Sequence, residues 1–215
     1  MKQFVVAGLG RFGSSVARNL SEKGFDVLVI DVDEEKIQNI SDIVTHAVEA
    51  DATDKDALNT LGVRNFDVAV VSIGTNVHAN ILATLILKEV GVPYVVSKAQ
   101  DELHGKVLDK VGADRVVFPE RDMGARVAQN LISANVLDFL EFAPDYSVVE
   151  IIATPNMVGK TLDELKLREK YNVNVMAIKR REDLNLSPGA NDKILEDDIL
   201  IVIGKNDNID KVQDL

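Results

Sequence analysis

The chain has 215 residues, a formal net charge of −11 and no cysteine. An acidic surface repels nucleic acid and anionic lipid, and no nucleic acid is therefore expected as a partner. Because the chain has no cysteine, disulfides and thiolate metal sites are excluded. Apolar residues make up 46% and charged residues 27%, as in globular proteins large enough for one or two domains.

The sequence predicts a chain without direct membrane insertion. Its strongest apolar helical segment, residues 81–87, ends at Lys88 and Glu89, far short of the ~20 residues that a membrane span requires. The N-terminus enters an apolar run directly, without a basic lead and a cleavable apolar segment. We therefore expect a cytoplasmic location, with docking on a membrane protein still open.

Short apolar runs alternate with helical patterns as far as Phe118. The expected strands span residues 4–7, 27–30, 45–49, 68–72, 94–97 and 115–118. The expected helices lie between them, at residues 12–23, 34–40, 55–61, 77–90 and 102–111. Near-continuous apolar strands separated by helices predict an α/β fold, a Rossmann-like doubly wound parallel sheet.

The pattern changes after Phe118. Residues 119–132 predict a helix that begins at Pro119, and residues 136–142 form a short segment that is apolar on one face. The sequence APDY at 143–146 predicts a turn and a domain boundary. The first domain is therefore expected to span residues 1–142, as a Rossmann fold followed by a crossover helix.

Residues 143–215 are expected to form a small α+β domain. Its predicted strands span residues 147–153, 173–179 and 199–203, with helical segments at 160–171 and 208–212. A unit of this size buries little apolar surface by itself. We therefore expect this domain to dimerise.

The sequence GLGRFG at positions 8–13 predicts a nucleotide-binding turn. Gly8 permits the tight turn, Gly10 lets the backbone approach a phosphate, and Gly13 lets the helix pack close to the strand, with Phe12 in the same turn. The motif follows a strand and opens a helix, whose N-terminus favours anions. Asp31 ends the second strand 18 residues after Gly13, where an acid accepts hydrogen bonds from ribose and repels the 2′-phosphate of NADP.

Arg11 distinguishes this turn from a general dinucleotide motif. A guanidinium between the second and third glycines forms charge-assisted hydrogen bonds to phosphate oxygens. The turn already serves the two phosphates of NAD, so a terminal β- or γ-phosphate would use Arg11 better. Lys98, at the end of the fifth strand, is a second cation on the same rim. The alternative for Arg11 is a solvated surface side chain.

Two further loops reach the carboxyl edge of the predicted sheet, where such folds bind ligands. Asp51 lies in the sequence ADATD with Ala52 and Thr53, and it either accepts a hydrogen bond from the adenine amino group or caps a turn. The loop after the fourth strand contributes Ser72, Gly74 and Asn76.

Glu120 has two interpretations, and no residue pattern predicts catalysis. Glu120 next to a helix start either compensates the helix dipole or binds a hard cation near phosphate. The histidines His46, His78 and His104 lie on separate segments with no partner acid at a diagnostic spacing. The sequence also lacks the lysine-containing phosphate loop of nucleoside triphosphatases. We therefore expect a protein that is not an enzyme.

These motifs resemble a known family. GLGRFG, ADATD, VSIGTNVHANILATLILKE at 71–89 and VSKAQDELHGKVLDKVGADRVVFPERDMG at 96–124 are similar to the KtrA/KtrC regulatory subunits of bacterial Ktr-type potassium uptake systems. More broadly they resemble the RCK (KTN) gating domains of potassium channels and transporters. The segment GKTLDELKLREKYNVNVMAIKR at 159–180 resembles the family's C-terminal domain, RCK_C. The resemblance covers nearly the whole chain.

The resemblance implies a gating ring that senses nucleotides. Homodimers would assemble into an octameric ring on the cytoplasmic face of a membrane-embedded potassium-translocating subunit, and ATP and ADP would compete for the first domain. It implies that Arg11 contacts the γ-phosphate, that Glu120 helps to hold Mg²⁺, Ca²⁺ or sodium, and that Asp31 and Asp51 hold ribose and adenine. Where the family often has glycine before this aspartate, the chain has Ala50.

The resemblance also implies that the second domain binds cyclic di-AMP. In this pattern an arginine would contact phosphate, and an asparagine would contact a base edge or phosphate. Apolar side chains would pack against the faces of the adenines. The positions that match this pattern are Arg168, Asn174, Pro188, Leu162, Val173 and Val175. The alternative for the apolar positions is packing in the core.

Two other functions are weighed beside ATP and ADP sensing. The first is an NAD(H)-sensing regulatory subunit of Trk type, in which Arg11 contacts only the pyrophosphate. The second is a small NAD-dependent oxidoreductase, for which the sequence offers neither an acid–base residue nor a substrate domain of ordinary size.

Overall fold

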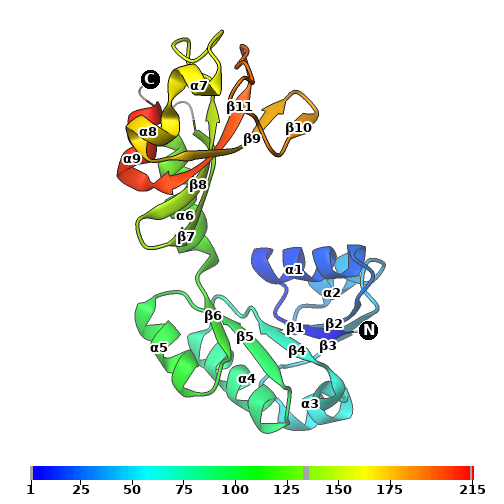
Figure 1. The fold of residues 1–215 in the computed structure, drawn as a ribbon. Coiled ribbons are helices and arrows are strands. Elements are labelled where there is room, and N and C mark those ends of the chain that lie inside the picture. The colour runs from blue at the N-terminus through cyan, green and yellow to red at the C-terminus, as the bar shows by residue number, and fades with distance from the viewer. Residues whose placement is uncertain (1, 133–135, 214) are drawn as a thin grey trace. The chain divides into compact units, whose positions relative to one another are not determined.

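A computed structural model describes residues 2–132, 136–213 and 215 of the chain. The chain divides into two compact units, Met1–Glu120 and Arg121–Leu215. Each unit is described by itself below (Figure 1).

The first unit is a doubly wound parallel sheet, as the sequence predicts. The strands are β1 (Gln3–Ala7), β2 (Asp26–Asp31), β3 (His46–Glu49), β4 (Val68–Val71), β5 (Tyr94–Lys98) and β6 (Arg115–Val117), in the order β3-β2-β1-β4-β5-β6. The helices are α1 (Arg11–Glu22), α2 (Glu34–Ile40), α3 (Lys55–Thr60), α4 (Val77–Glu89) and α5 (Glu102–Lys110), with a short 3₁₀ turn η1 (Val63–Asn65). The helices α1 and α2 cover one face of the sheet, and α3, α4 and α5 cover the other (Figure 1).

The apolar runs of the strands serve both faces of this sheet. Val6 and Val29 pack with the residues of α1 and α2, whereas Val5 and Ile30 pack with those of α3 and α4. All four side chains are fully buried. Because successive residues of a strand point to opposite faces, a sheet covered on both sides needs apolar residues at every position.

The second unit is built around an antiparallel sheet. Its strands are β7 (Val136–Ala143), β8 (Tyr146–Ile152), β9 (Asn174–Arg180), β10 (Asp183–Asn185) and β11 (Ile199–Lys205), in the order β10-β9-β11-β8-β7. Its helices are α6 (Pro119–Ile132), which starts at the junction, α7 (Leu162–Leu165), α8 (Leu167–Tyr171) and α9 (Asn206–Gln213). The core gathers around Ile151, Ile194, Leu200 and Val202, which are fully buried.

The division between the units differs from the expected boundary after residue 142. The chain divides after Glu120, and residues 136–143 form β7, which pairs antiparallel with β8 across a turn in which Asp145 has φ +65°. The segment expected to complete the first domain is therefore an edge strand of the second unit's sheet. The periodicity of a short apolar run fits a helix and a strand equally well, so pairing with β8 decides that this segment is a strand.

An ion pair joins β9 to the start of β11 in the second unit. The Arg180 guanidinium donates two hydrogen bonds of 2.8 Å, from Nε to Asp198 Oδ1 and from Nη2 to Asp198 Oδ2. Asp198 is fully buried, whereas about half of the Arg180 side chain is exposed. The hydrogen bonds from Arg180 hold the pKa of Asp198 below its ordinary value, against the opposing effect of burial.

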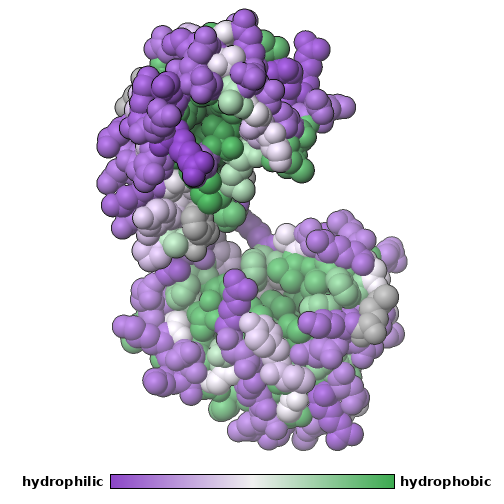
Figure 2. All heavy atoms as spheres, in the orientation of Figure 1, coloured by the Kyte–Doolittle hydropathy of each residue, from purple (hydrophilic) through white to green (hydrophobic). Residues whose placement is uncertain are grey.

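On the face shown in Figure 2, polar side chains cover most of both units, and apolar side chains gather in limited areas over each. None of the helices that the structure describes has the length and apolar character of a membrane span.

Candidate functional site

The glycine-rich turn joins β1 to α1. Gly8 has φ +96°, and its N–H donates to Ile30 O at 2.8 Å. A Cβ on Gly13 would lie 2.0 Å from Gly8 O, whereas a Cβ on Gly10 would meet only Ser72 O, at 3.9 Å. Gly13 therefore permits close packing of α1, and Gly10 has open space at the position of a Cβ, while the approach of its backbone to a phosphate stays a prediction.

The N-terminus of α1 opens into the same region. Gly10 is its N-cap, and no side-chain cap or first-turn acid is found there among the described residues. The free N–H groups of the first turn and the helix dipole therefore offer a local positive potential. Arg11 begins this helix with an exposed side chain. Such an arrangement favours an anion locally, despite the chain's net negative charge.

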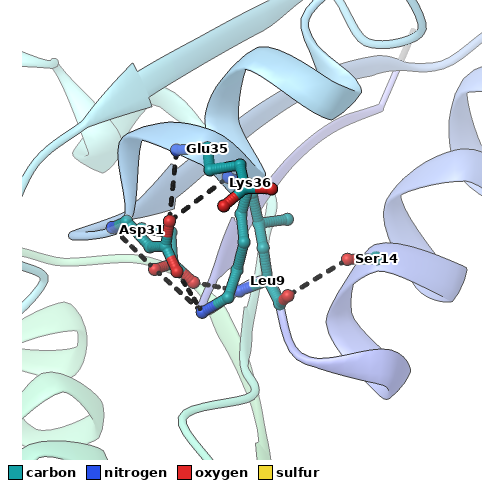
Figure 3. A network of polar contacts seen from close by, with 6 residues as sticks. Leu9, Ser14, Asp31, Glu35 and Lys36 are labelled. Carbon is teal, nitrogen blue, oxygen red and sulfur yellow. Dashed lines mark hydrogen bonds and ion pairs between the residues drawn. The ribbon is translucent and has the colours of Figure 1, made fainter.

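Asp31 is the buried carboxylate of this region (Figure 3). Its Oδ2 accepts a hydrogen bond of 2.5 Å from the Leu9 N–H, and its Oδ1 accepts one of 3.0 Å from the Asp33 N–H. Lys36 Nζ lies 3.5 Å from Asp31 Oδ1 and 3.3 Å from Asp33 Oδ2. The backbone contacts fix Asp31 at the end of β2, where a ribose acid is predicted.

The ADATD loop holds Asp51 at the edge of the sheet. Asp51 Oδ1 accepts hydrogen bonds from the Thr53 N–H at 2.8 Å and the Thr53 hydroxyl at 2.7 Å. Ala52 is buried in the core, while Asp51 is exposed. Asp51 therefore caps a turn, and it also lines the cavity described below.

The loop after β4 forms another wall. Ser72 is buried, and its hydroxyl has no hydrogen-bond partner among the described residues. Asn76 caps α4 by accepting the Ala79 N–H at 3.0 Å. Asn80 Nδ2 donates to Ile73 O at 2.9 Å and to Lys98 O at 3.3 Å, which ties this loop to the end of β5.

Two cations act on one acid at the rim of this region. Lys98 Nζ donates a hydrogen bond to Glu120 Oε1; Lys98 is largely buried and Glu120 is exposed. The hydrogen bond from Lys98 chiefly lowers the pKa of Glu120, and the charge of Arg11 adds to this effect. Glu120 is therefore ionised at neutral pH and lies in the field of both predicted phosphate-binding cations.

These residues line one cavity of about 720 Å³. Of the residues predicted in the first unit, the cavity is lined by Gly8, Gly10, Arg11, Phe12, Asp31, Asp51, Ala52, Ser72, Gly74, Asn76, Lys98 and Glu120. The predicted residues Gly13 and Thr53 do not line it. They act behind it, by helix packing and by hydrogen bonding to Asp51.

The sequence reasoning missed several wall residues. These are Ile30, Val32, Lys36, Ala50, Ile73, Thr75, Ala79 and Gln100. Most are neutral, and only their place beside a predicted residue would have indicated them. Lys36 carried a usable signal, because it lies three residues after the N-cap Asp33 in the first turn of α2.

Within the part of the chain that the structure describes, no group of three His, Asp or Glu side chains could hold a metal ion. His46 and His78 are exposed, whereas His104 is buried and accepts the Gln100 N–H at Nδ1. Burial lowers the pKa of His104, against the opposing charge of Asp101. His104 thus has a packing environment, and Glu120 alone supplies no cation cage.

The residues predicted in the second unit lie in different environments. Arg168 in α8 and Asn174 at the start of β9 are exposed, and Pro188 is half-buried in a loop. Hydrogen bonds between Asp163 N and Ala190 O, and between Leu162 N and Asp192 O, tie that loop to the start of α7. Among the predicted apolar positions, Val173 is fully buried in the core, and Leu162 and Val175 pack half-buried against it. For Val173 the structure favours core packing.

The sequence is similar to known proteins along its whole length. The TrkA-N domain matches residues 4–119, and the TrkA-C domain matches residues 147–215. The Ktr system potassium uptake protein C of Bacillus subtilis is 49% identical over 212 residues, which cover 99% of this chain and 96% of that protein. Protein A of the same system in Bacillus subtilis is 43% identical over the same shares of the two chains.

Solved structures show the same fold. The GsuK RCK domain superposes with a TM-score of 0.69 and 16% sequence identity over 100% of this chain. The GsuK channel bound to NAD superposes with a TM-score of 0.66 and 17% sequence identity over 96% of this chain. The chain spans 47% and 38% of those chains. The two matched domains and the identity to both Ktr proteins show that this chain belongs to the KtrA/KtrC family of RCK regulatory subunits of potassium uptake systems.

Proposed function

We propose that this chain regulates a Ktr-type potassium transporter by binding ATP and ADP in the cavity of its first unit. The observation that carries the proposal is the meeting of the α1 N-terminus, Arg11 and Lys98 on one cavity with the buried acid Asp31. The cations suit phosphates, and Asp31 suits a ribose. A ligand shifts a conformational equilibrium only by its difference in affinity for the two states, and a γ-phosphate supplies such a difference.

Arg11 is proposed to read the γ-phosphate. Its side chain is exposed at the cavity, and its charge acts on Glu120 across the rim. Lys98 is already paired with Glu120, so Arg11 is the cation better able to gain from an additional phosphate. ADP would keep the contacts to Asp31 and Asp51 and lack this one.

We expect Arg11→Ala to lower ATP affinity about tenfold and ADP affinity clearly less, because the lost charge-assisted hydrogen bond goes to the γ-phosphate. Calorimetry on nucleotide-free protein measures both affinities. Arg18→Ala is the matched control, since Arg18 lies on the same helix outside the cavity and contacts Asn39 O. Equal losses for ATP and ADP would contradict the proposed role of Arg11.

NAD(H) is the second candidate ligand. GsuK structures hold NAD in one case and ADP in another, and Arg11 would then contact only the pyrophosphate. A thermal-shift panel of ATP, ADP, NAD and NADH ranks the ligands, and stronger stabilisation by NADH would favour the Trk-type alternative. We propose no catalytic step, in line with relatives named as potassium uptake proteins.

A cation near the phosphates is proposed to use Glu120 as one ligand. Glu120 is exposed and ionised, and it lies beside Lys98 at the cavity rim. Since the described residues form no complete metal cage, phosphate oxygens or a second subunit would supply the other ligands. Mg²⁺, Ca²⁺ and sodium all accept such oxygen donors.

The assembly is proposed to be a homodimer that builds an octameric ring on a membrane-embedded potassium-translocating subunit, with the chain cytoplasmic and peripheral to the membrane. On α6, Met123, Val127 and Leu131 are exposed and spaced every fourth residue. This spacing places them on one side of the helix as an apolar stripe. Such a stripe supports burial against a second subunit.

Cyclic di-AMP is proposed as the ligand of the second unit, where Arg168 and Asn174 present exposed polar side chains six residues apart. In the full chain, we expect Arg168→Ala to weaken cyclic di-AMP binding at least about tenfold, because arginine forms charge-assisted hydrogen bonds to phosphate. Lys170→Ala, a charge change on the same helix, is the control. The proposal fails if calorimetry detects no cyclic di-AMP binding to the unsubstituted chain, or if both variants lose affinity equally.

A further inference from the structure

The charges on the nucleotide cavity balance. Among the described residues that line it, the cations are Arg11, Lys36 and Lys98, and the acids are Asp31, Asp51 and Glu120. The chain as a whole carries a net charge of −11. A neutral cavity in such an acidic protein lowers the repulsion that a polyanionic ligand meets on entry. Each of the three cations therefore affects how strongly a negatively charged ligand can bind in the cavity.

Lys36 is the cation next to the buried acid. Its ammonium lies 3.5 Å from Asp31 and 3.3 Å from Asp33, and Figure 3 shows its side chain extending toward Asp31. Burial alone would lower the pKa of Lys36, but the charge of Asp31 and the hydrogen bond with Asp33 raise it above the ordinary value. Lys36 is therefore charged at every pH where the protein is expected to work.

The contacts of Asp31 show that Lys36 is not needed to hold it in place. The Leu9 N–H and Asp33 N–H bind its two oxygens at 2.5 and 3.0 Å, while Lys36 stays at 3.5 Å. That separation exceeds a charge-assisted hydrogen bond of about 2.7–2.9 Å. The main effect of Lys36 on Asp31 is thus electrostatic, and it leaves acceptor capacity on the carboxylate.

The carboxylate that suits a ribose repels phosphates bound in the same cavity. A carboxylate that is shielded from water acts on a nearby phosphate through a lower effective dielectric than bulk water. Its repulsion grows with the charge of the ligand, and so does the attraction of a cation at the same place. An ammonium beside the carboxylate, although shared with Asp33, reduces this repulsion while the ribose contact is kept.

We infer that Lys36 is a specificity-determining residue that offsets the charge of Asp31 and thereby helps a cavity with a ribose-binding acid to accept highly charged nucleotides. The inference rests on the proposed binding of adenine nucleotides. It assigns Lys36 a role in the choice between nucleotides of different charge, and it leaves adenosine recognition to Asp31 and its neighbours.

The test compares ATP and AMP, which share adenosine and differ in charge. We expect Lys36→Met to lower the ratio of ATP to AMP affinity about fivefold at low salt, since the net charge that the phosphates meet becomes more negative. Asp31→Asn is expected to raise this ratio, and the double variant to return it near the unsubstituted value. Lys36→Arg should preserve the ratio, as should the control Lys23→Met outside the cavity.

The outcomes separate this inference from the proposed function. Absence of ATP and ADP binding to the unsubstituted chain overturns the function itself. If that chain binds both but Lys36→Met lowers ATP and AMP affinity by the same factor, Lys36 has a local structural role and the inference is wrong. An unchanged ratio in Lys36→Met, or a double variant that stays as low as Lys36→Met, overturns it as well. Calorimetry at two salt concentrations supplies every value.

Discussion

Gly8→Ala is expected to lower the free energy of unfolding of the first unit by about 3 kcal/mol and to abolish tight ATP binding. Gly8 has φ +96°, a conformation that strains any residue with a Cβ. An added Cβ would also lie 2.9 Å from Ser72 C and 3.0 Å from Ile73 N. These are backbone atoms at the end of β4, so relief requires the cavity wall itself to move.

The control Gly24→Ala separates the two causes. Gly24 has φ +79° and open space around the position of a Cβ, so it carries the conformational cost of about 1 kcal/mol without a clash. Urea unfolding followed by far-UV circular dichroism measures both variants, and calorimetry measures ATP binding. Similar losses of stability in both variants, or unchanged ATP affinity in Gly8→Ala, would show that the close approach of Gly8 to Ser72 and Ile73 is unimportant.

Much of the first unit could be predicted because its local signals agree. The strands are buried on both faces, so their apolar runs are nearly continuous, and the glycine turn requires residues that only glycine supplies at Gly8 and Gly13. Asp31 could be placed because the end of β2 faces the same edge as the turn. Where backbone geometry dictates residue type, sequence alone predicts which residues gather around this cavity.

The remaining features depend on contacts that a linear pattern does not contain. The segment 136–143 is a strand because β8 pairs with it, and nothing within the segment distinguishes this from a helix turn. The spacing of Lys36 from the N-cap Asp33 in α2 indicates their contact, but the approach of Lys36 to Asp31 is seen only in the folded chain. Val173 matches a ligand-binding pattern and yet fills the core.

The proposed nucleotide site joins two requirements that oppose each other electrostatically. A ribose is best held by a carboxylate, whereas two or three phosphates are best held by cations and helix N–H groups. In this chain two of the acids at the cavity each have a cation beside them: Lys36 lies beside Asp31, and Lys98 pairs with Glu120. In the proposed function, Arg11 is then the cation that responds to the number of phosphates, and its substitution is therefore expected to separate the affinity for ATP from that for ADP.

We expect Arg180→Met to lower the free energy of unfolding of the second unit by about 3 kcal/mol at pH 7, because it leaves the buried Asp198 carboxylate without its counter-charge. This value is at the low end for breaking a buried ion pair, since half of Arg180 is exposed and Asp198 keeps its hydrogen bond from the Leu195 N–H. Urea unfolding at pH 7 measures the loss. The double variant Arg180→Met/Asp198→Leu should recover most of it, because no buried charge remains.

The pH dependence distinguishes this electrostatic effect from lost packing. The pKa of Asp198 is lowered in the folded chain, so its contribution is fully present above the unfolded value of about 4 and is lost as the pH falls further. In Arg180→Met the unpaired carboxylate gains from protonation instead. The stability difference between the two proteins should therefore shrink as the pH falls from 7 toward 4 and below. A difference that stays constant over this range, or a double variant as unstable as Arg180→Met, would assign the effect to the aliphatic part of Arg180 and not to its charge.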